Sequence, residues 1–366
     1  MTSFTLPQWY DLHMHLRQGA LLAPLIQAQR DMGCAGVLAM PNTKPPVGKI
    51  LAGDDLPYWS IEEYLDMIRA AGGDQFIDVI VPLYLTKDTT AQMIEGGVKS
   101  GVLRAAKYYP PHGTTNAGHG QPLDVFIENG VLEAMESQGV VLCVHGEAHG
   151  LPAESYFDAD VNAEDIFYRR QMPRLAEKFP KLKIVCEHIT TRAAAGVVRQ
   201  AGPNVAATVT PQHLLYTAGH LMQGLNYHLY CLPVVKFEKD RAALREAVTD
   251  SRNTQFFAGT DSAPHTQKAT ECGCAAGCFT GGIAPQLYAQ GFEEAGADLS
   301  TKEDQHIFRA FLCENGPAFY GLPMSQKTFT LTKKSRSLAA LETSEGPVIP
   351  LPLGLGHASL PWSIET

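Results

Sequence analysis

The chain has 366 residues, 45% of them apolar and 18% charged, with a formal net charge of −9 at pH 7. This composition is that of a globular protein and excludes a disordered one, and the acidic balance argues against nucleic acid or an anionic membrane as the main partner. No apolar run reaches the length that spans a bilayer, and residues 1–8 lack the basic and apolar regions of a secretory signal.

Short apolar runs, many of them β-branched, alternate with segments whose apolar residues recur at helical spacing. The predicted strands are residues 9–16, 36–41, 76–85, 103–109, 140–145, 183–189, 205–210 and 256–260. The predicted helices are residues 21–32, 61–71, 90–100, 125–138, 167–179, 191–200 and 239–251. This alternation predicts an α/β fold with parallel strands covered by helices. Eight strands over roughly 250 residues favour a (β/α)₈ TIM-like barrel. The alternative, a doubly wound open sheet, would place a glycine-rich phosphate loop after its first strand, and none is there.

The first predicted strand carries two histidines one residue apart, His13 and His15. Successive side chains of a strand point to opposite faces, so both imidazoles project from one face about 7 Å apart and can turn toward one metal ion. Leu12, Met14 and Leu16 then face the other way and can pack under a helix. Two ordinary histidines on a half-buried strand would have the same spacing, so the pair alone does not establish a metal site.

Four later strands also carry a ligand-type residue at or near their ends: Lys107, His145, His188 and Asp261. Any one of them could be a hydrogen-bonded structural residue, but six such residues in barrel order favour a metal centre. Four histidines and one aspartate are too many for one catalytic zinc with an open position, and they suit two ions if an anionic ligand bridges them. Lys107 carboxylated by carbon dioxide would be such a bridge, because a carbamate offers two oxygens. Paired zinc ions about 3.5–4 Å apart can share a hydroxide that is nucleophilic at neutral pH.

Two long loops, residues 110–122 and 262–282, follow predicted strands at the ends where barrel enzymes place their chemistry. The sequence shows no internal repeat and no low-complexity linker. We therefore expect residues 1–366 to form a single domain, with the barrel over about 9–322. Residues 323–366 are predicted to be a C-terminal extension that packs on the barrel and contributes no site chemistry.

Eight cysteines in a chain of this length do not indicate a disulfide scaffold. Four of them lie in apolar runs and are expected to be buried thiols: Cys34, Cys143, Cys186 and Cys231. Cys272, Cys274 and Cys278 form a cluster that lacks a fourth ligand at paired spacing. An ordered loop rich in glycine and cysteine is therefore a better interpretation of this segment than a structural zinc site.

Taken together, the strand-end residues resemble the amidohydrolase superfamily: H-x-H on the first strand, lysine on the fourth, histidine on the fifth and sixth, and aspartate on the eighth. The finer motifs resemble the dihydroorotases of the shorter bacterial and fungal type. They are residues 11–17, 40–42, 106–109, 113–116, 144–147, 187–191, 210–214, 230–233, 259–265, 272–274 and 315–321. The resemblance covers roughly residues 9–322.

The resemblance implies a zinc enzyme with two ions per subunit. The implied ligands are His13, His15 and Asp261 for one zinc, His145 and His188 for the other, and N6-carboxylysine at Lys107 as the bridge. The implied substrate-binding residues are Arg17, Asn42, Thr114, Thr115, Leu232, His265 and Ala275. Of these, Arg17, Asn42 and His265 would bind a substrate carboxylate, for which the planar fork of arginine is suited. Asp261 would be catalytic as well, first as general base and then as general acid.

The activity that the resemblance implies is reversible hydrolysis of a cyclic amide, converting (S)-dihydroorotate to N-carbamoyl-L-aspartate and back in pyrimidine (UMP) biosynthesis. It also implies a cytoplasmic homodimer with a small-molecule substrate.

Two alternative functions remain open. One is another cyclic amidase, such as a hydantoinase or allantoinase, against which the carboxylate-binding residues argue; the other is a catalytically dead scaffold, which would have lost ligands. One extra alanine within residues 274–278 departs from the family pattern and bears on Ala275.

Overall fold

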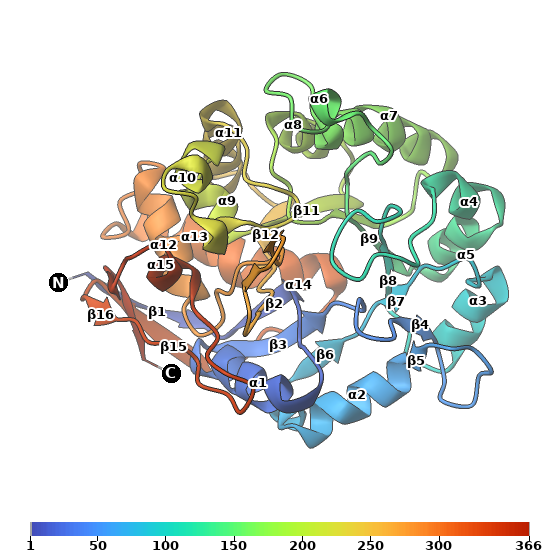
Figure 1. The fold of residues 1–366 in the computed structure, drawn as a ribbon, viewed down its shortest axis with the longest axis horizontal. Coiled ribbons are helices and arrows are strands. Elements are labelled where there is room, and N and C mark those ends of the chain that lie inside the picture. The colour runs from blue at the N-terminus through green and yellow to red at the C-terminus, as the bar shows by residue number, and fades with distance from the viewer. Residues whose placement is uncertain (1, 366) are drawn as a thin grey trace.

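The computed structural model describes residues 2–365 and arranges the predicted strands as a ring surrounded by helices (Figure 1). The ring contains, in order, β2 (Trp9–Met14), β3 (Cys34–Ala39), β6 (Asp78–Ile80), β7 (Leu83–Tyr84), β8 (Ala105–Tyr108), β9 (Val141–Val144), β10 (Ile184–Cys186), β11 (Val205–Val209) and β12 (Phe256–Ala258). The hydrogen-bonded neighbours in this ring are parallel. The predicted α/β class and the (β/α)₈ barrel are therefore confirmed.

The third strand of the ring is divided into two short pieces. β6 pairs with β3, whereas β7 pairs with β8. Val81 and Pro82 lie between the two pieces. Proline has no backbone N–H to donate to a neighbouring strand, which explains why the predicted strand 76–85 is interrupted there. The two pieces together occupy one position in the ring, with β6 bonded to the strand on one side and β7 to the strand on the other.

The ring closes at a seam between its last and first strands. There the backbone just beyond β12 pairs with the end of β2: the N–H of Asp261 donates to the carbonyl of His13 at 2.8 Å, and the N–H of His15 donates to the carbonyl of Ser262 at 3.0 Å. The seam therefore brings two segments from opposite ends of the barrel sequence side by side, and each of them carries predicted metal ligands.

Helices cover the outer face of the ring. The longer ones are α1 (Leu22–Asp31), α2 (Ile61–Ala70), α3 (Ala91–Lys99), α7 (Ala163–Lys178), α8 (Arg192–Gln200), α11 (Glu238–Thr249), α12 (Ala284–Glu294) and α13 (Lys302–Arg309). The shorter ones include α6 (Ala153–Tyr156), α9 (Pro211–Leu215), α10 (Ala218–Met222), α14 (Asn315–Tyr320) and α15 (Leu351–Gly354). Capping boxes begin α2, where Ser60 pairs with Glu63, and α7, where Asn162 pairs with Asp165. Each box satisfies backbone N–H groups that would otherwise lack partners at the helix start.

The prediction of one continuous helix over residues 125–138 is wrong. The segment divides into α4 (Leu123–Glu128) and α5 (Val131–Gln138). Gly130 lies at the break with a φ of 82°, a left-handed conformation that glycine adopts without steric cost. The helical spacing of apolar residues continues across the break, so periodicity alone does not reveal it.

Alternating strand positions build two apolar layers, one facing the helices and one inside the ring. The inner cluster consists of Tyr10, Leu12, Ala35, Leu38, Met40, Ile80, Ala105, Val141, Cys143, Val185, Ala206 and Phe257. Phe319 and Tyr320 of α14 pack against it. The prediction that Leu12 packs under an outer helix with Met14 is wrong, because a register irregularity in β2 between Asp11 and Met14 changes the alternation. Met14 belongs to the helix-facing layer, as predicted.

The C-terminal extension packs on the barrel together with the N-terminal strand. β15 (Thr328–Thr332) pairs antiparallel with β1 (Ser3–Pro7) on one side and with β18 (Ser363–Glu365) on the other. Trp362 is fully buried, and its indole N–H donates to Glu293 of α12 at 3.1 Å.

The remaining strands form three small pairs: β4 (Val47–Lys49) with β5 (Trp59–Ser60), β13 (Ala269–Thr270) with β14 (Gly273–Cys274), and β16 (Arg336–Ser337) with β17 (Ser359–Leu360). Among the helices of residues 2–365, none combines the length and apolarity needed to cross a membrane.

Candidate active site

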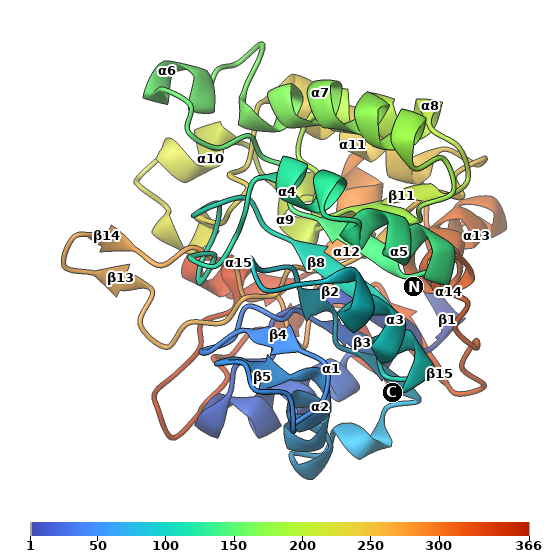
Figure 2. The ribbon, with the colours of Figure 1, turned by 90° about the vertical axis from the view of Figure 1, so that its right-hand side faces the viewer.

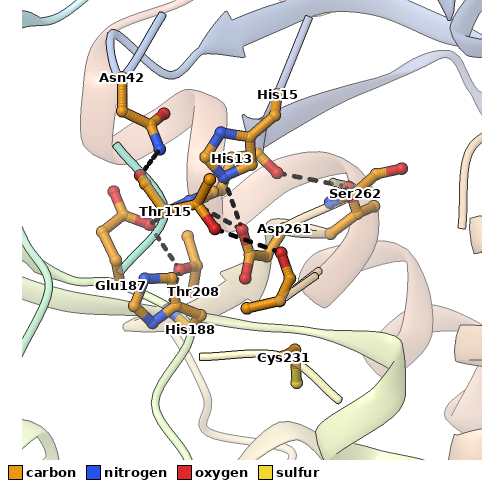
Figure 3. A network of polar contacts seen from close by, with 12 residues as sticks. His13, His15, Asn42, Thr115, Glu187, His188, Thr208, Cys231, Asp261 and Ser262 are labelled. Carbon is orange, nitrogen blue, oxygen red and sulfur yellow. Dashed lines mark hydrogen bonds and ion pairs between the residues drawn. The ribbon is translucent and has the colours of Figure 1, made fainter. Parts of the chain in front are cut away.

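Three of the predicted metal ligands meet at the seam of the barrel (Figure 3). His13, His15 and Asp261 are buried and offer ligand atoms that all lie within 4.8 Å of one another. Nε2 of His15 lies 2.9 Å from Oδ1 of Asp261, and Nε2 of His13 lies 3.4 Å from the same oxygen. Imidazole and carboxylate are ligands that zinc takes in proteins, so this cluster can hold a metal ion.

The other three predicted ligands, Lys107, His145 and His188, lie against the same cluster. The ring centroid of His188 is 4.9 Å from that of His13 and 4.8 Å from that of His145. Lys107 is fully buried, and its Nζ lies 5.0 Å from the centre of the Tyr109 ring. This Nζ has no hydrogen-bond partner within the part of the chain that the structure describes. The structure thus brings all six predicted residues into one buried group.

Two glutamates that the sequence analysis did not single out hold histidines of this group. Oε2 of Glu187 lies 2.6 Å from Nδ1 of His13, and Oε2 of Glu147 lies 2.9 Å from Nε2 of His145. A carboxylate on one ring nitrogen fixes the tautomer and leaves the other nitrogen free to bind a metal. His13 would therefore bind through Nε2 and His145 through Nδ1. A sequence signal exists for Glu147, which lies two residues after His145, but not for the contact of Glu187 with His13, which is 174 residues away.

Two residues of the group have left-handed backbone conformations, with φ values of 48° at Asp261 and 41° at His188. Such values are uncommon for residues other than glycine and persist where neighbouring contacts enforce them. The hydroxyl of Thr208 accepts from the N–H of His188 at 2.6 Å. Next to Asp261, the N–H and hydroxyl of Thr260 donate to the buried carboxylate of Asp11 at 2.9 and 2.7 Å. These contacts fix the strand ends that carry the ligands.

Burial and hydrogen bonds set the charges of the group. Burial alone would raise the pKa of the Asp261 carboxyl, but hydrogen bonds from His13 and His15 outweigh it and hold this pKa well below its usual range. Burial lowers the pKa of His15 to about 4 and that of His188 well below its usual range. Burial also lowers the pKa of Lys107. Neutral pH therefore favours an ionised Asp261 beside neutral His15 and His188, which is the protonation that metal ligands need. For His13, burial alone would lower the pKa, but the Glu187 carboxylate outweighs it and raises this pKa.

A cavity of about 360 Å³ opens beside the cluster. It is lined by five of the predicted ligand or substrate-binding residues: His15, Arg17, Asn42, Thr115 and His265. A smaller adjoining pocket touches Thr114, Leu232 and Asp261 as well. Six of the seven predicted substrate-binding residues thus line one or both of these adjoining spaces next to the ligand cluster. That residue set is suited to a small anion, because Arg17 is a half-buried cation with donors in a planar fork.

The seventh predicted substrate-binding residue, Ala275, is not among the residues that line these two spaces. Its neighbour Ala276 lines the small pocket, and the carbonyl of Ala276 accepts from Nε2 of His265 at 2.8 Å. The motif resemblance points to Ala275, whereas the backbone path brings Ala276 to the small pocket.

The loop of residues 110–122 lies against the cavity and is tied to its wall. The side-chain amide of Asn42 donates to the carbonyl of Thr115 at 2.9 Å, and the amide of Asn116 donates to the carbonyl of Asn42, also at 2.9 Å. The hydroxyl of Thr115 reaches the carbonyl of Ala276 at 3.5 Å. The loop therefore joins the segment after β3 to the segment before Cys278 and covers the small pocket between them.

The amino-acid sequence of the chain is similar to those of known dihydroorotases. No family model matches the chain. The chain is 42% identical over 352 residues to a dihydroorotase of Aromatoleum aromaticum, covering 94% of this chain and 95% of that one. It is 40% identical over 370 residues to a dihydroorotase of Neisseria meningitidis serogroup C, covering 100% of both.

Solved structures extend the comparison to the fold. A dihydroorotase from Saccharomyces cerevisiae in complex with 5-fluoroorotic acid superposes with a TM-score of 0.85 at 28% identity, covering 100% of this chain and 99% of that one. A dihydroorotase from Campylobacter jejuni gives a TM-score of 0.83 at 27% identity, covering 100% and 98%. A dihydropyrimidinase from Brevibacillus agri gives a TM-score of 0.69 at 15% identity, which shows a shared fold alone.

Proposed function

The chain belongs to the dihydroorotase family of cyclic amide hydrolases, and from this premise we propose that it interconverts (S)-dihydroorotate and N-carbamoyl-L-aspartate in pyrimidine biosynthesis. The observation that carries the proposal is the juxtaposition of a buried His13, His15 and Asp261 cluster with a cavity that Arg17 lines. A cluster able to hold metal suits hydrolysis of an amide, and a half-buried guanidinium suits a substrate that bears a carboxylate. A cytoplasmic homodimer stays a prediction of the sequence analysis.

We propose that the six-residue group holds two zinc ions, with Lys107 carboxylated between them. The residues fit such a centre, because a buried amine without a hydrogen-bond partner is costly as a structural element. Its lowered pKa favours the neutral amine, which is the form that reacts with carbon dioxide. When bound, zinc would polarise the ring amide carbonyl and lower the pKa of water. His13, His15 and Asp261 would hold one ion and His145 and His188 the other.

The proton path runs through Asp261. This residue is ionised at neutral pH, so it can accept a proton from the attacking water as general base. As the ring C–N bond breaks, Asp261 would deliver that proton to the leaving nitrogen, which leaves a free ureido group and a new carboxyl group that ionises by releasing its own proton to solvent. In the biosynthetic direction the same transfers run in reverse. Arg17 and His265 would hold the substrate carboxylate, so that the ring amide faces Asp261.

An assay of dihydroorotate hydrolysis on protein of measured zinc content tests the proposal. We expect turnover that is lost when a chelator removes the metal and regained when zinc is added back. Hydantoin and allantoin serve as control substrates, because they lack the carboxylate that Arg17 would bind, and they should be turned over far more slowly. Equal turnover of hydantoin would instead assign the chain another cyclic amidase activity. A chain that bound no metal and hydrolysed none of the three would be a scaffold.

Replacing both Thr114 and Thr115 with alanine is expected to lower the catalytic rate about 10- to 100-fold and leave zinc content unchanged. The two hydroxyls lie at the small pocket on the loop of residues 110–122, where they can stabilise charge that develops in the transition state. A hydrogen bond to a charged group contributes about 1.5–3 kcal/mol, and an interaction made mainly in the transition state affects turnover more than KM.

The matched control for this loop variant is Thr330→Ala with Thr332→Ala, which removes two exposed hydroxyls of β15 far from the cavity. Steady-state kinetics with dihydroorotate should show wild-type turnover for the control. If the Thr114 and Thr115 variant also retained wild-type turnover, the loop would have no catalytic role.

A further inference from the structure

Lys268 is a buried lysine that the proposed reaction does not use. Only 8% of it is exposed, and it forms no ion pair with a carboxylate among residues 2–365. Its Nζ donates instead to two backbone carbonyls, those of Tyr230 at 2.7 Å and of Gly277. Lysine is rarely buried without a charged partner, so a position that keeps it there needs a physical explanation.

The two carbonyls belong to two separate walls of the small pocket. Tyr230 lies two residues before Leu232, and Gly277 follows Ala276; Leu232, Ala276 and Gly277 all line the pocket. A backbone hydrogen bond from Gly277 N–H to the Tyr230 carbonyl, at 2.9 Å, joins the walls directly. The ammonium of Lys268 adds two more links at the same junction, so it acts as a crosslink behind the pocket.

The wall at Gly277 has little freedom to move inward. Gly277 has a φ of +142°, and a Cβ there would lie 2.6 Å from Cβ of Ala263 and 2.9 Å from Nε2 of His265. The preceding carbonyl, of Ala276, accepts from Nε2 of His265 at 2.8 Å and lies 3.5 Å from the hydroxyl of Thr115. The position of this wall therefore orients two side chains that are proposed to bind substrate.

The chain directly after Lys268 leaves the body of the protein. The hairpin of β13 and β14 projects from the barrel face (Figure 2). Where the chain returns after β14, the N–H of Ala275 donates to the carbonyl of Lys268 at 2.8 Å. Lys268 and Ala275 thus close the base of the hairpin, and the Lys268 ammonium anchors that base to the Tyr230 segment. Without the anchor, the returning strand and Ala276 would be held by fewer contacts.

We propose that Lys268 is a positioning residue for the substrate pocket: by joining the carbonyls of Tyr230 and Gly277, it holds the Ala276 wall where His265 is oriented to bind the substrate carboxylate. The inference rests on the proposed function, because dihydroorotate is the ligand whose binding it would affect. Lys268 itself touches neither the substrate nor the metal ligands. Its loss should therefore weaken substrate binding and leave the metal centre intact.

The test compares Lys268→Met with Lys49→Met in the full-length, zinc-loaded protein. Lys49 is a matched control, since it is 7% exposed and its Nζ also donates to two backbone carbonyls, those of Ala52 and Asp54, which line neither the cavity nor the small pocket. We expect Lys268→Met to raise KM for dihydroorotate about tenfold or more, with kcat within about twofold and zinc content unchanged. Lys49→Met should leave KM at the wild-type value.

Hydrogen exchange provides a second measurement on the same samples. Amides of residues 228–232 and 273–279 should exchange faster in Lys268→Met, while the rest of the barrel stays protected. Lys268→Gln, which retains a neutral donor, should fall between wild type and Lys268→Met in both measurements, and it decides the question if Lys268→Met does not fold. A folded variant with wild-type KM, or with unchanged exchange in these two segments, would overturn the inference. Absence of dihydroorotate turnover in the wild type would overturn the proposed function instead.

Discussion

Lys107→Ala protein is expected to fold and to lose dihydroorotate turnover by a factor of at least about a thousand. The substitution removes the proposed bridge between two metal ions, and the electrostatic stabilisation that bound metal supplies amounts to several kcal/mol, each 1.4 kcal/mol being a factor of ten in rate. The fold should survive, because the Lys107 amine has no hydrogen-bond partner in residues 2–365 whose loss would leave another group unsatisfied.

Zinc content, measured on the same preparation as the rate, should fall well below two ions per chain in Lys107→Ala. Small carboxylic acids such as acetate should restore part of the activity, because they can occupy the space of the missing carbamate. Lys183→Ala is the control, since Lys183 is exposed and its ammonium donates to the carbonyl of Phe319 and lies over the Phe319 ring, at the opposite end of the barrel. Full zinc occupancy with normal turnover in Lys107→Ala would sink the assignment of a bridging ligand.

Arg17→Met protein is expected to lose kcat/KM for dihydroorotate by a factor of about 30 to several thousand and to keep its zinc. Arg17 lines both the cavity and the small pocket; Asn42 lines both as well, and His265 lines the cavity. Loss of one partner from a buried, hydrogen-bonded charge pair costs about 2–5 kcal/mol. Methionine retains the length and much of the volume of the side chain, so the change isolates the charge and its donors.

Arg17→Lys separates charge from geometry. Lysine keeps the positive charge but lacks the planar fork that binds both oxygens of a carboxylate, so its kcat/KM should lie between those of wild type and Arg17→Met. Hydantoin, which carries no carboxylate, provides the specificity measurement: its slow turnover should be nearly the same in all three proteins. If Arg17→Met slowed hydantoin and dihydroorotate equally, Arg17 would serve the reaction centre and not the substrate carboxylate.

The parts of this molecule that sequence predicts best are those with short-range physical causes. Each predicted strand of the ring is present because buried parallel strands appear as apolar runs at regular spacing. The six ligand-type residues converge because the ends of parallel strands meet at one edge, so chain order alone places His188 next to both His13 and His145. Their roles as ligands stay predictions.

The parts that sequence did not predict depend on single backbone events or on distant partners. The irregularity in β2 moves Leu12 into the inner cluster, and Gly130 divides a helix whose apolar spacing continues across it. The strand β1 was not predicted, because its partner β15 lies more than 300 residues away in the chain. The shift from Ala275 to Ala276 has the same origin, since only the path of the folded loop determines which alanine faces the pocket.

The seam between β12 and β2 has a consequence for the order of events during synthesis. His15 and Asp261 are 246 residues apart in sequence, yet they lie 2.9 Å apart across the seam. His13 and His15 therefore leave the ribosome long before Asp261. A nascent chain that ends before Asp261 cannot contain the complete ligand cluster. Since the hydrogen bonds between Asp261 and His13 and between His15 and Ser262 also close the ring, completion of the barrel and assembly of this ligand cluster are one step. Contacts of such long sequence separation form late in folding, so a chain that holds metal at this cluster is one that has already closed its barrel.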